Sequence, residues 1–286
     1  MPVAVPAHEH RSIEQLREQY EVECELAARL RAAGKPERRG LYGEVYAELT
    51  RRVPHLPMLA PRDDPRGRLY EVELETILLA SFLHPETTVL EVGSGNCALS
   101  AHLARRVRQV FAVEPCAEMR RGIELPPNVT IIEDDAPPLD LPAGSVDLAF
   151  SCHFIEHLHP DDARDHVLEM HRLLTPGGRY VCVTPNRLWG PHDVSRYFDD
   201  GALGLHLQEY DHAEVASLLR AGGFRRVAVL RGIGRPPTRW PTAPYRLAST
   251  LLGRLSPAPR RRLLNLFSRA GEPFRALEQV VLVGER

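Results

Sequence analysis

The segment HFIEHLHP, residues 153–160, concentrates side chains that can move protons or bind metals. His153, Glu156 and His157 have the spacing i, i+3, i+4, and His206 could approach from a later loop. An imidazole titrates near neutrality, so His157 could accept a proton from a substrate. Imidazole and carboxylate groups also suit a divalent ion. Glu156 and His157 could instead only hydrogen-bond their own loop, and the three interpretations stay open on spacing alone.

A glycine-containing turn indicates a second site. In the segment TVLEVGSGNCALSAHLA, residues 88–104, an apolar run reaches Glu91, turns on Gly93 and Gly95, and continues with helical spacing. Glycine has no Cβ, so a ligand can approach the main chain closely there. The turn fits the pattern G-x-G-x-x-G/A, and Glu114 ends the next apolar run, where a carboxylate accepts ribose hydroxyls. A nucleotide-like ligand is predicted.

The acidic residues around this turn separate two kinds of nucleotide. A pyrophosphate binds at a helix N-terminus, so Glu91 is an unfavourable neighbour for NAD. A ligand with an ammonium and a sulfonium would be stabilised by the same carboxylate. Asp134 and Asp135 follow a further strand at the same edge and could accept from an adenine amino group. Alternatively, they form an exposed turn.

The elements that position these residues follow from the alternation of apolar runs. From residue 88 onward, seven short apolar strands are separated mostly by amphipathic helices. This pattern predicts an α/β, Rossmann-like, doubly wound and mostly parallel seven-stranded sheet with helices on both faces. The chain is divided accordingly into an N-terminal helical cap, 1–80, and a domain at 81–286 with a Pro-rich, then helical, insertion at 232–270.

The ordered motifs resemble the class I S-adenosylmethionine-dependent methyltransferases of the small-molecule type. EVGSGNCALS is similar to their glycine motif, VFAVEPCAEM to their ribose-binding motif, and DDAPPLDLPAGSVDLAFS to the adenine-side motif, although Cys97 and Ala98 replace the common third glycine. The resemblance implies S-adenosylmethionine as cofactor, S-adenosylhomocysteine as product, and in-line methyl transfer to an O or N acceptor. It also implies these cofactor-binding residues: Glu91, Gly93, Gly95, Asn96, Cys97, Glu114, Pro115, Asp134, Asp135, Ala136 and Ser151.

His157 and His153 are the expected catalytic residues, and no metal is expected. The alternative metal set is His153, Glu156, His157 and His206, which is similar to a cluster of the small-RNA 2′-O-methyltransferases, where the first position is Glu. Three other functions stay open: an NAD-type oxidoreductase, a metal-assisted RNA 2′-O-methyltransferase, and a catalytically silent cofactor-binding scaffold.

The loop TPNRLWGPHDVSRYF, residues 184–198, follows the fifth strand and is the predicted substrate wall. Its aromatic, imidazole and guanidinium groups could recognise an acceptor, or the loop could pack on the helices as structure. The predicted substrate-binding residues are Trp189, His192, Arg196 and Tyr197.

Composition narrows the class of protein. The net charge is −2, which gives no general attraction to nucleic acid, and none is expected as a partner. The five cysteines form no C-x-x-C pair and are expected to be reduced. We find no apolar run long enough for a membrane span and no signal peptide, so a cytoplasmic location is expected. Residues 215–271 contain arginine but no acidic residue; the segment could be a solvated face, an internal contact or an anion site.

Overall fold

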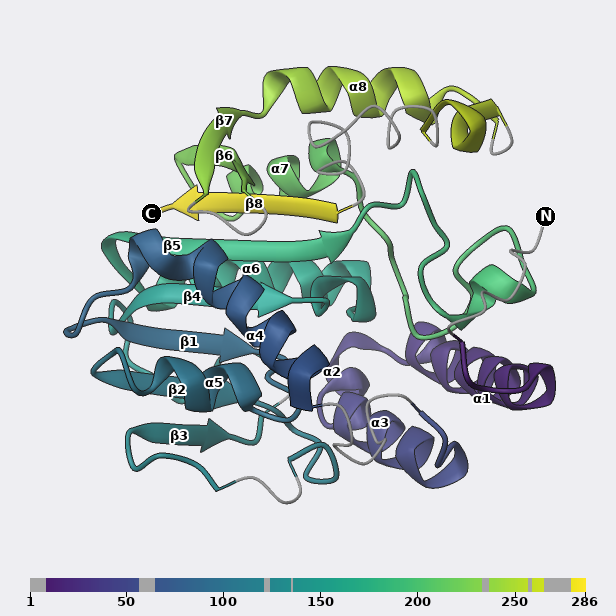
Figure 1. Cartoon of the computed structure of the whole chain (residues 1–286), viewed down its shortest axis with the longest axis horizontal. Helices are drawn as coiled ribbons and strands as arrows, with labels where there is room; N and C mark the ends of the chain where they lie inside the picture. Colours follow the sequence, from purple (N-terminus) through teal and green to yellow (C-terminus); the bar gives the residue numbers. More distant parts are fainter. Residues whose placement is uncertain are drawn as a thin grey trace.

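The computed structural model describes residues 9–56, 65–120, 124–134, 136–232, 237–256, 259–264 and 279–286, without the side chains of 65–70. Eight strands form one sheet in the order β3-β2-β1-β4-β5-β8-β6-β7 (Figure 1). They are β1 Thr88–Val92, β2 Gln109–Val113, β3 Val129–Ile132, β4 Val146–Cys152, β5 Leu174–Pro185, β6 Arg226–Arg231, β7 Thr238–Pro241 and β8 Gln279–Glu285. The helices are α1 Ile13–Ala32, α2 Lys35–Arg38, α3 Leu41–Arg52, α4 Pro65–Leu79, α5 Ala98–Leu103, α6 Pro160–Leu173, α7 His212–Ala221 and α8 Ala243–Gly253, with 3-10 turns η2 Ala80–Phe82, η3 Ile155–His157 and η4 Val194–Tyr197.

The sheet confirms the predicted mostly parallel, doubly wound topology. The pairs β1–β2, β1–β4, β2–β3 and β4–β5 are parallel, and β8 is antiparallel to both β5 and β6. The predicted number of seven strands is wrong by one. The additional strand, β7, pairs antiparallel with the edge strand β6, within the region that was expected to be Pro-rich and then helical. Its Pro241 lies at the strand end on the sheet edge, where a missing N–H does not interrupt a ladder.

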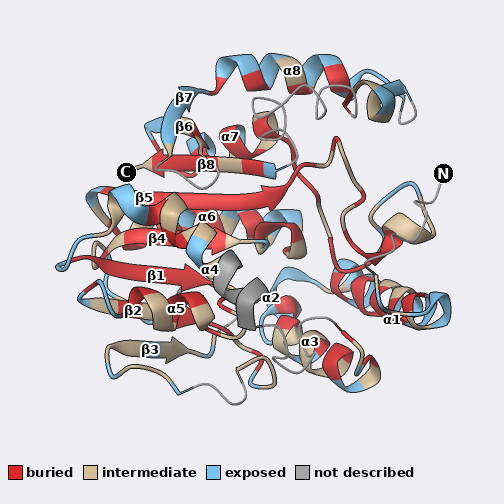
Figure 2. Ribbon diagram, in the orientation of Figure 1, coloured by how far each residue is buried: buried red, intermediate tan, exposed pale blue. Residues whose placement is uncertain are grey.

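The two faces of the sheet are covered by different helices. On one face, Leu79 of α4 and Leu103 of α5 pack with Val89, Leu148 and Val181 of the sheet. On the other, α6 and α7 contribute Val167, Met170, Val215 and Leu219 to a larger core. Figure 2 shows β1, β4 and β5 mostly buried between these layers. Strands buried on both faces need apolar side chains throughout, which explains the near-continuous apolar runs of β1, β4 and β5 in the sequence.

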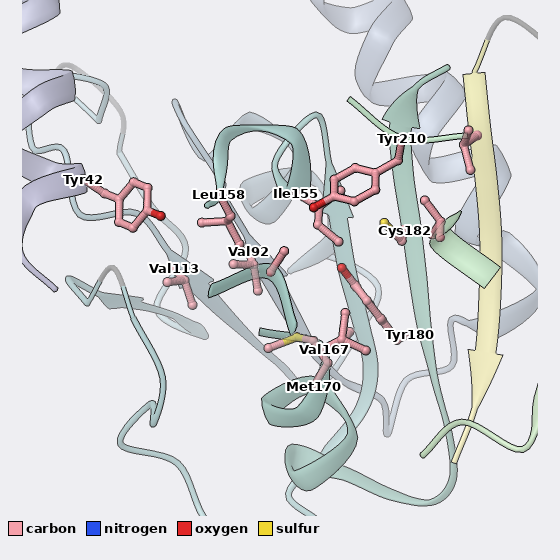
Figure 3. Close-up of a cluster of buried hydrophobic side chains, with 14 of the residues drawn as sticks. Tyr42, Val92, Val113, Ile155, Leu158, Val167, Met170, Tyr180, Cys182 and Tyr210 are labelled. Atoms are coloured by element: carbon pink, nitrogen blue, oxygen red, sulfur yellow. The ribbon is translucent and has the colours of Figure 1, made fainter. Parts of the chain in front are cut away.

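The larger core continues to the carboxyl ends of the strands. Figure 3 shows Met170 of α6 near Val92, with Tyr42 approaching from the N-terminal helices. Tyr180 lies fully buried in the same core, and its hydroxyl is within hydrogen-bond distance of Ser151 Oγ at 2.7 Å and of His166 Nε2 at 2.9 Å. The buried hydroxyl of Tyr180 is therefore satisfied within the core by Ser151 and His166.

The N-terminal helices α1, α2 and α3 lie beyond the carboxyl ends of the parallel strands (Figure 1). Helix α1 begins at a capping box in which Ser12 accepts from the backbone N–H of Gln15 and Gln15 accepts from that of Ser12. Helix α4 instead packs on the sheet through Leu79. The division of the chain at residue 80 stays a prediction.

The described residues of the insertion lie at the edge of the sheet that ends in β6 and β7. Helix α8 packs on α7, where the ring of Tyr245 stacks on His212 with centroids 5.0 Å apart. Figure 1 shows α8 far from α1 and α3. Among the residues that the structure describes, every helix is too short or too polar to span a bilayer.

Candidate functional site

Two adjoining cavities occupy the edge where the parallel strands end. The first, cavity 1, has a volume of about 570 Å³ and lies over the ends of β1 and β2, against α2, α3 and α6. Its walls carry Val92, Val113, Met119, Leu139, Phe154, Leu158 and Met170, and its polar groups include Glu114, Asp134, Asp162 and Glu169. An apolar cavity of this size with a few convergent polar groups is typical of a binding site for a small organic molecule.

The glycine turn forms part of the cavity 1 wall through Gly93 and Gly95, both of which have a positive φ. Gly93 has φ of 73°, and a Cβ there would lie 2.6 Å from Cδ2 of Phe154. Gly95 has φ of 50°, and its N–H donates to Glu114 Oε2 at 2.8 Å. The other carboxylate oxygen of Glu114 accepts from the N–H of Cys116 at 2.9 Å. The turn and the end of β2 are thereby held together, with Glu114 lining the cavity.

Among the predicted cofactor-binding residues, Glu91 is placed away from the cavity linings. Its carboxylate accepts a hydrogen bond from Ser100 Oγ of α5. Burial raises the pKa of Glu91 to about 8, and the neighbouring charge of Glu75 also raises it. At neutral pH the side chain is thus mainly protonated in this structure, whereas the sequence argument assumed a charged carboxylate.

Three other residues of the predicted set lie in the glycine turn or in the neighbouring strand β4, outside the cavity lining. Asn96 Oδ1 accepts from the N–H of Ala98 at 3.0 Å, which caps the start of α5. Cys97 is buried with φ of 55°, and Ser151 is fully buried against Tyr180. Asn96, Cys97 and Ser151 do not line cavity 1.

The end of the third strand contributes the opposite wall. Asp134, Ala136 and Pro115 line cavity 1, as predicted positions near an adenine or ribose would. Asp134 forms an ion pair with Arg39 of the N-terminal region, Nη2 to Oδ2 at 3.3 Å, and accepts from the N–H of Ala136 at 3.2 Å. Asp135 lies outside the described residues.

The second cavity, cavity 2, has a volume of about 610 Å³ and lies between α1, α3, the loop at 185–197 and the segment around His206. Cavities 1 and 2 share three lining residues: Tyr46, His153 and His157. A molecule in either cavity can therefore contact these same three side chains.

His157 is held firmly at this junction. Its Nδ1 lies 3.0 Å from the carbonyl oxygen of Leu205, so the ring donates from Nδ1 and keeps a lone pair on Nε2. Burial first, and the charge of His206 second, lower the pKa of His157 to about 4. The imidazole is neutral at neutral pH.

Glu156 ties the junction to the sheet. Its side chain is fully buried, with Oε2 accepting from Thr184 Oγ1 at 2.9 Å and Oε1 lying 3.3 Å from His153 Nδ1. Burial opposes ionisation, but the hydrogen bond with His153 and the nearby imidazoles lower the pKa of Glu156 to about 2. His153 is about half exposed and has φ of 51°.

Tyr46 of α3 is a site residue that the sequence interpretation missed. It lines both cavities, and its ring meets that of His157 edge-on at a centroid distance of 5.9 Å. Its hydroxyl is buried and has no hydrogen-bond partner within the described residues. The helical spacing of Tyr42 and Tyr46 was a usable signal, because both face the same side of α3.

A buried cluster fixes the N-terminal helices over cavity 1. Arg38 binds Asp162 of α6 through two hydrogen bonds, at 2.6 and 2.9 Å, and donates to the carbonyl oxygen of Ala33 at 2.8 Å. The hydroxyl of Tyr42 donates to Asp162 Oδ2 at 2.7 Å and accepts from the N–H of His159 at 2.9 Å. The arrangement joins the cap directly to the segment that carries His157.

The predicted substrate wall divides into two parts. His192, Arg196 and Tyr197 line cavity 2, whereas Trp189 packs beside Leu188 in a separate small core with Leu252 of α8. From the N-terminal region, Arg11, Gln19, Glu23, Tyr46 and Leu49 complete cavity 2. The described residues of the insertion line neither cavity.

Comparison with known proteins agrees with this geometry. Residues 90–182 match a family model described as a methyltransferase domain. A probable S-adenosylmethionine-dependent methyltransferase of Mycolicibacterium smegmatis is 34% identical over 152 residues, 51% of this chain and 56% of that protein. An uncharacterised methyltransferase of Bacillus thuringiensis is 33% identical over 114 residues, 39% of this chain and 51% of its own length. The chain spans about half the length of these curated relatives.

Solved structures show the same fold. A putative methyltransferase in complex with the Haloferax volcanii Trm112 methyltransferase activator superposes with a TM-score of 0.55 at 19% identity, over 80% of this chain and 95% of that chain. A putative O-methyltransferase of Nostoc punctiforme gives a TM-score of 0.52 at 13% identity, over 96% of this chain and 69% of that chain. At these identities the likeness concerns the architecture of the sheet and its helices.

Proposed function

Since residues 90–182 match a methyltransferase domain and the relatives include a probable S-adenosylmethionine-dependent methyltransferase, we propose that this chain is a class I enzyme of that kind and transfers a methyl group from S-adenosylmethionine to an O or N atom of a small molecule. The observation that carries the proposal is the contact between two cavities at Tyr46, His153 and His157. Cavity 1 would hold the cofactor and cavity 2 the acceptor.

The residues of cavity 1 fit S-adenosylmethionine. The cavity volume of about 570 Å³ suits a ligand of this size. Gly93 and Gly95 allow the ligand to approach the backbone, and Glu114 keeps free lone pairs for ribose hydroxyls beside its two backbone hydrogen bonds. Asp134 and Ala136 would border the base, and Phe154 would shield the end nearest the junction.

When bound, the cofactor supplies a methyl group already activated on a sulfonium. The chain's own residues then have to align the acceptor and exclude water. His157 presents the lone pair of Nε2, which would accept a hydrogen bond from the acceptor's O–H or N–H and take up its proton. The unpartnered hydroxyl of Tyr46 would give a second hydrogen bond, and His153 would close the exposed side.

The chemistry of cavity 2 favours a small molecule over RNA. Glu23 and Asp193 line it as buried carboxylates, which would repel a phosphate backbone. Membership of the methyltransferase family favours S-adenosylmethionine over NAD. A silent cofactor-binding scaffold would have no need for a second cavity at the reacting end of the first.

The proposal is tested by incubating the protein with a small-metabolite extract and S-adenosylmethionine labelled on its methyl group. We expect label in a compound of low molecular mass, and no label after replacing Tyr46 and His157 together by Phe and Ala. Label recovered only in RNA or protein fractions, or in no acceptor from a broad set of extracts, would contradict it.

A further inference from the structure

Three side chains at the wall of cavity 2 converge like the ligands of a metal ion. Within the described part of the chain, Glu156, His157 and His206 each offer one ligand atom, and these atoms lie within 4.8 Å of one another. Metal–nitrogen and metal–oxygen bonds of about 2.0–2.2 Å place opposite ligand atoms at most about 4.4 Å apart. Side-chain shifts of a few tenths of an ångström would bring all three onto one ion.

Both imidazoles are already oriented by partners on their other nitrogen. His157 Nδ1 lies 3.0 Å from the carbonyl oxygen of Leu205, and His206 Nδ1 lies 2.8 Å from Glu209 Oε1. A metal-binding histidine normally donates its second ring N–H to a backbone carbonyl or a carboxylate. The two Nε2 atoms are therefore the ones left for a ligand, and the rings meet edge-on at a centroid distance of 4.8 Å.

The carboxylate of Glu156 is likewise oriented by a hydrogen bond. Glu156 is fully buried, and Thr184 Oγ1 donates to its Oε2 at 2.9 Å. His153, which the sequence placed first in the candidate set, contacts Oε1 at 3.3 Å and lies outside the converging group of three. The geometry thus selects three of the four residues in the alternative metal set.

The buried charges around these residues also call for a cation. Four buried carboxylates lie at or beside cavity 2: Glu23, Glu156, Asp193 and Glu209. Burial raises the pKa of Glu23 and of Asp193, and the neighbouring imidazole of His206 only partly opposes this shift. Two arginines line the cavity: Arg11 is bound by Glu9 and Gln19, and Arg196 lies over the ring of Tyr197 at 5.8 Å from its centroid. A further positive charge at the junction would stabilise this group.

We propose that Glu156, His157 and His206 bind a divalent first-row transition-metal ion at the wall of cavity 2. Mixed imidazole and carboxylate ligands suit ions such as Mn²⁺, Fe²⁺, Co²⁺ and Zn²⁺ better than Mg²⁺. His157 and His206 line cavity 2, so the coordination positions left open by the protein face the acceptor. The sequence favoured a metal-free site because it does not fix the geometry of the turn that carries the neighbouring histidines.

The ion would refine the role of His157. This part of the inference rests on the proposed methyl transfer: the imidazole would act on the acceptor through the ion, which would bind an acceptor oxygen and lower the pKa of its hydroxyl group. The hydroxyl proton would pass to water, and the oxygen would take the methyl group as the bond to sulfur breaks and S-adenosylhomocysteine leaves. Binding of the ion itself requires no assumption about the acceptor.

The test is a titration of the purified, chelator-treated protein with Co²⁺, followed by visible d–d absorption and by calorimetry. We expect one equivalent to bind and Zn²⁺ to displace it. His206→Ala and Glu156→Gln should each raise the dissociation constant for Co²⁺ by about 100-fold or more, because each removes a ligand. Glu209→Gln should raise it by about 10- to 100-fold, the usual effect of removing a partner that orients a ligand.

The matched control is His171→Gln, which replaces a histidine in the last turn of α6, beside Gly223 and outside both cavities. It should leave the Co²⁺ affinity unchanged. S-adenosylhomocysteine binding by each variant checks that the protein remains folded, and His206→Ala keeps the test decisive if Glu156→Gln does not fold. Absence of a stoichiometric Co²⁺ site in the native protein, or Co²⁺ affinity unaffected by His206→Ala, would overturn the metal site. Either result would leave the methyltransferase proposal standing if labelled methyl still reaches a small molecule.

Discussion

The imidazole of His157 uses one nitrogen for the fold and leaves the other for a ligand. Its Nδ1 is held by the carbonyl oxygen of Leu205, and the pKa of about 4 keeps the ring neutral over the physiological range. A neutral ring with a fixed tautomer can accept a proton, orient an acceptor or bind an ion. All three roles require the same Nε2 lone pair.

Removing this lone pair should slow catalysis without weakening cofactor binding. His157→Ala should lower kcat by about 10²-fold or more, the usual scale for the loss of a proton-accepting group. The affinity for S-adenosylhomocysteine, measured by calorimetry, should stay within about twofold, because Glu114 and the glycine turn are untouched. His171→Ala is the control. Full activity together with unchanged thermal stability in His157→Ala would remove this residue from the mechanism.

Glu91 carries a second prediction, which concerns stability and pH. Its folded-state pKa is raised from 4.5 to about 8, so stability from the protonated form is fully present below about pH 4.5 and is lost as the pH rises to about 8. Glu91→Gln cannot ionise and should lose less stability across this window, by up to about 1.4 kcal/mol per pH unit.

The measurement is chemical denaturation of the native protein and of Glu91→Gln between pH 5 and 8. The difference in unfolding free energy should change steadily in favour of the variant as the pH rises. A constant difference would mean that Glu91 is ionised in the folded protein throughout.

A buried ion pair, Arg38 with Asp162, joins the N-terminal helices to α6. The side chain of Arg38 is 4% exposed and that of Asp162 is 14% exposed, and Tyr42 shares the same carboxylate. Removing one partner of such a pair leaves a buried charge and typically costs about 3–5 kcal/mol. Partial exposure of Asp162 moderates this value.

We therefore expect Arg38→Met to destabilise the protein by about 3 kcal/mol and to raise the acceptor KM, since α2 and α3 border both cavities. Arg52→Met removes a comparable side chain whose pairs with Glu25 and Glu48 lie at the surface, and should leave the denaturant midpoint nearly unchanged. The denaturant midpoints of the two variants measure the two losses of stability. Equal, small losses would show that the Arg38–Asp162 pair does not hold the cap in place.

Elements with a strong period were predictable, and elements fixed by distant contacts were not. The apolar runs of β1, β2 and β4 predicted buried parallel strands, and the helical pattern of residues 245–255 predicted α8. Strand β7 was missed because TRWP has only four residues and each of them is exposed, so its pairing with β6 depends on the sheet edge being present.

At the level of the whole chain, the sequence predicted much of cavity 1 but only part of cavity 2, where it named His192, Arg196 and Tyr197 and missed Tyr46. Gly93, Gly95 and Glu114 belong to one local motif, and local patterns suffice to place them. Cavity 2 is assembled from α1, α3, the loop at 185–197 and the segment around His206, which lie far apart in the chain. Tyr46 could be assigned to it only once the Arg38–Asp162 pair had positioned α3.

The two cavities are lined by different parts of the chain. The parallel strands supply the wall of cavity 1, and the N-terminal helices cover both cavities from outside the sheet. The edge that bears α8 is free of contact with either cavity in the described residues. Cofactor binding and acceptor binding should therefore depend on different parts of the molecule that meet at Tyr46, His153 and His157.

The most direct test of this account is calorimetric titration with S-adenosylhomocysteine, compared with NAD, for the native protein and for Glu114→Gln. Glu133→Gln serves as the control, because Glu133 is 65% exposed and lines neither cavity. The account predicts one site for S-adenosylhomocysteine and none for NAD, with the dissociation constant raised about 10- to 100-fold by Glu114→Gln, the scale of a lost hydrogen bond to a charged group, and unchanged by Glu133→Gln. Binding of NAD without S-adenosylhomocysteine, or equal affinity in Glu114→Gln, would contradict it.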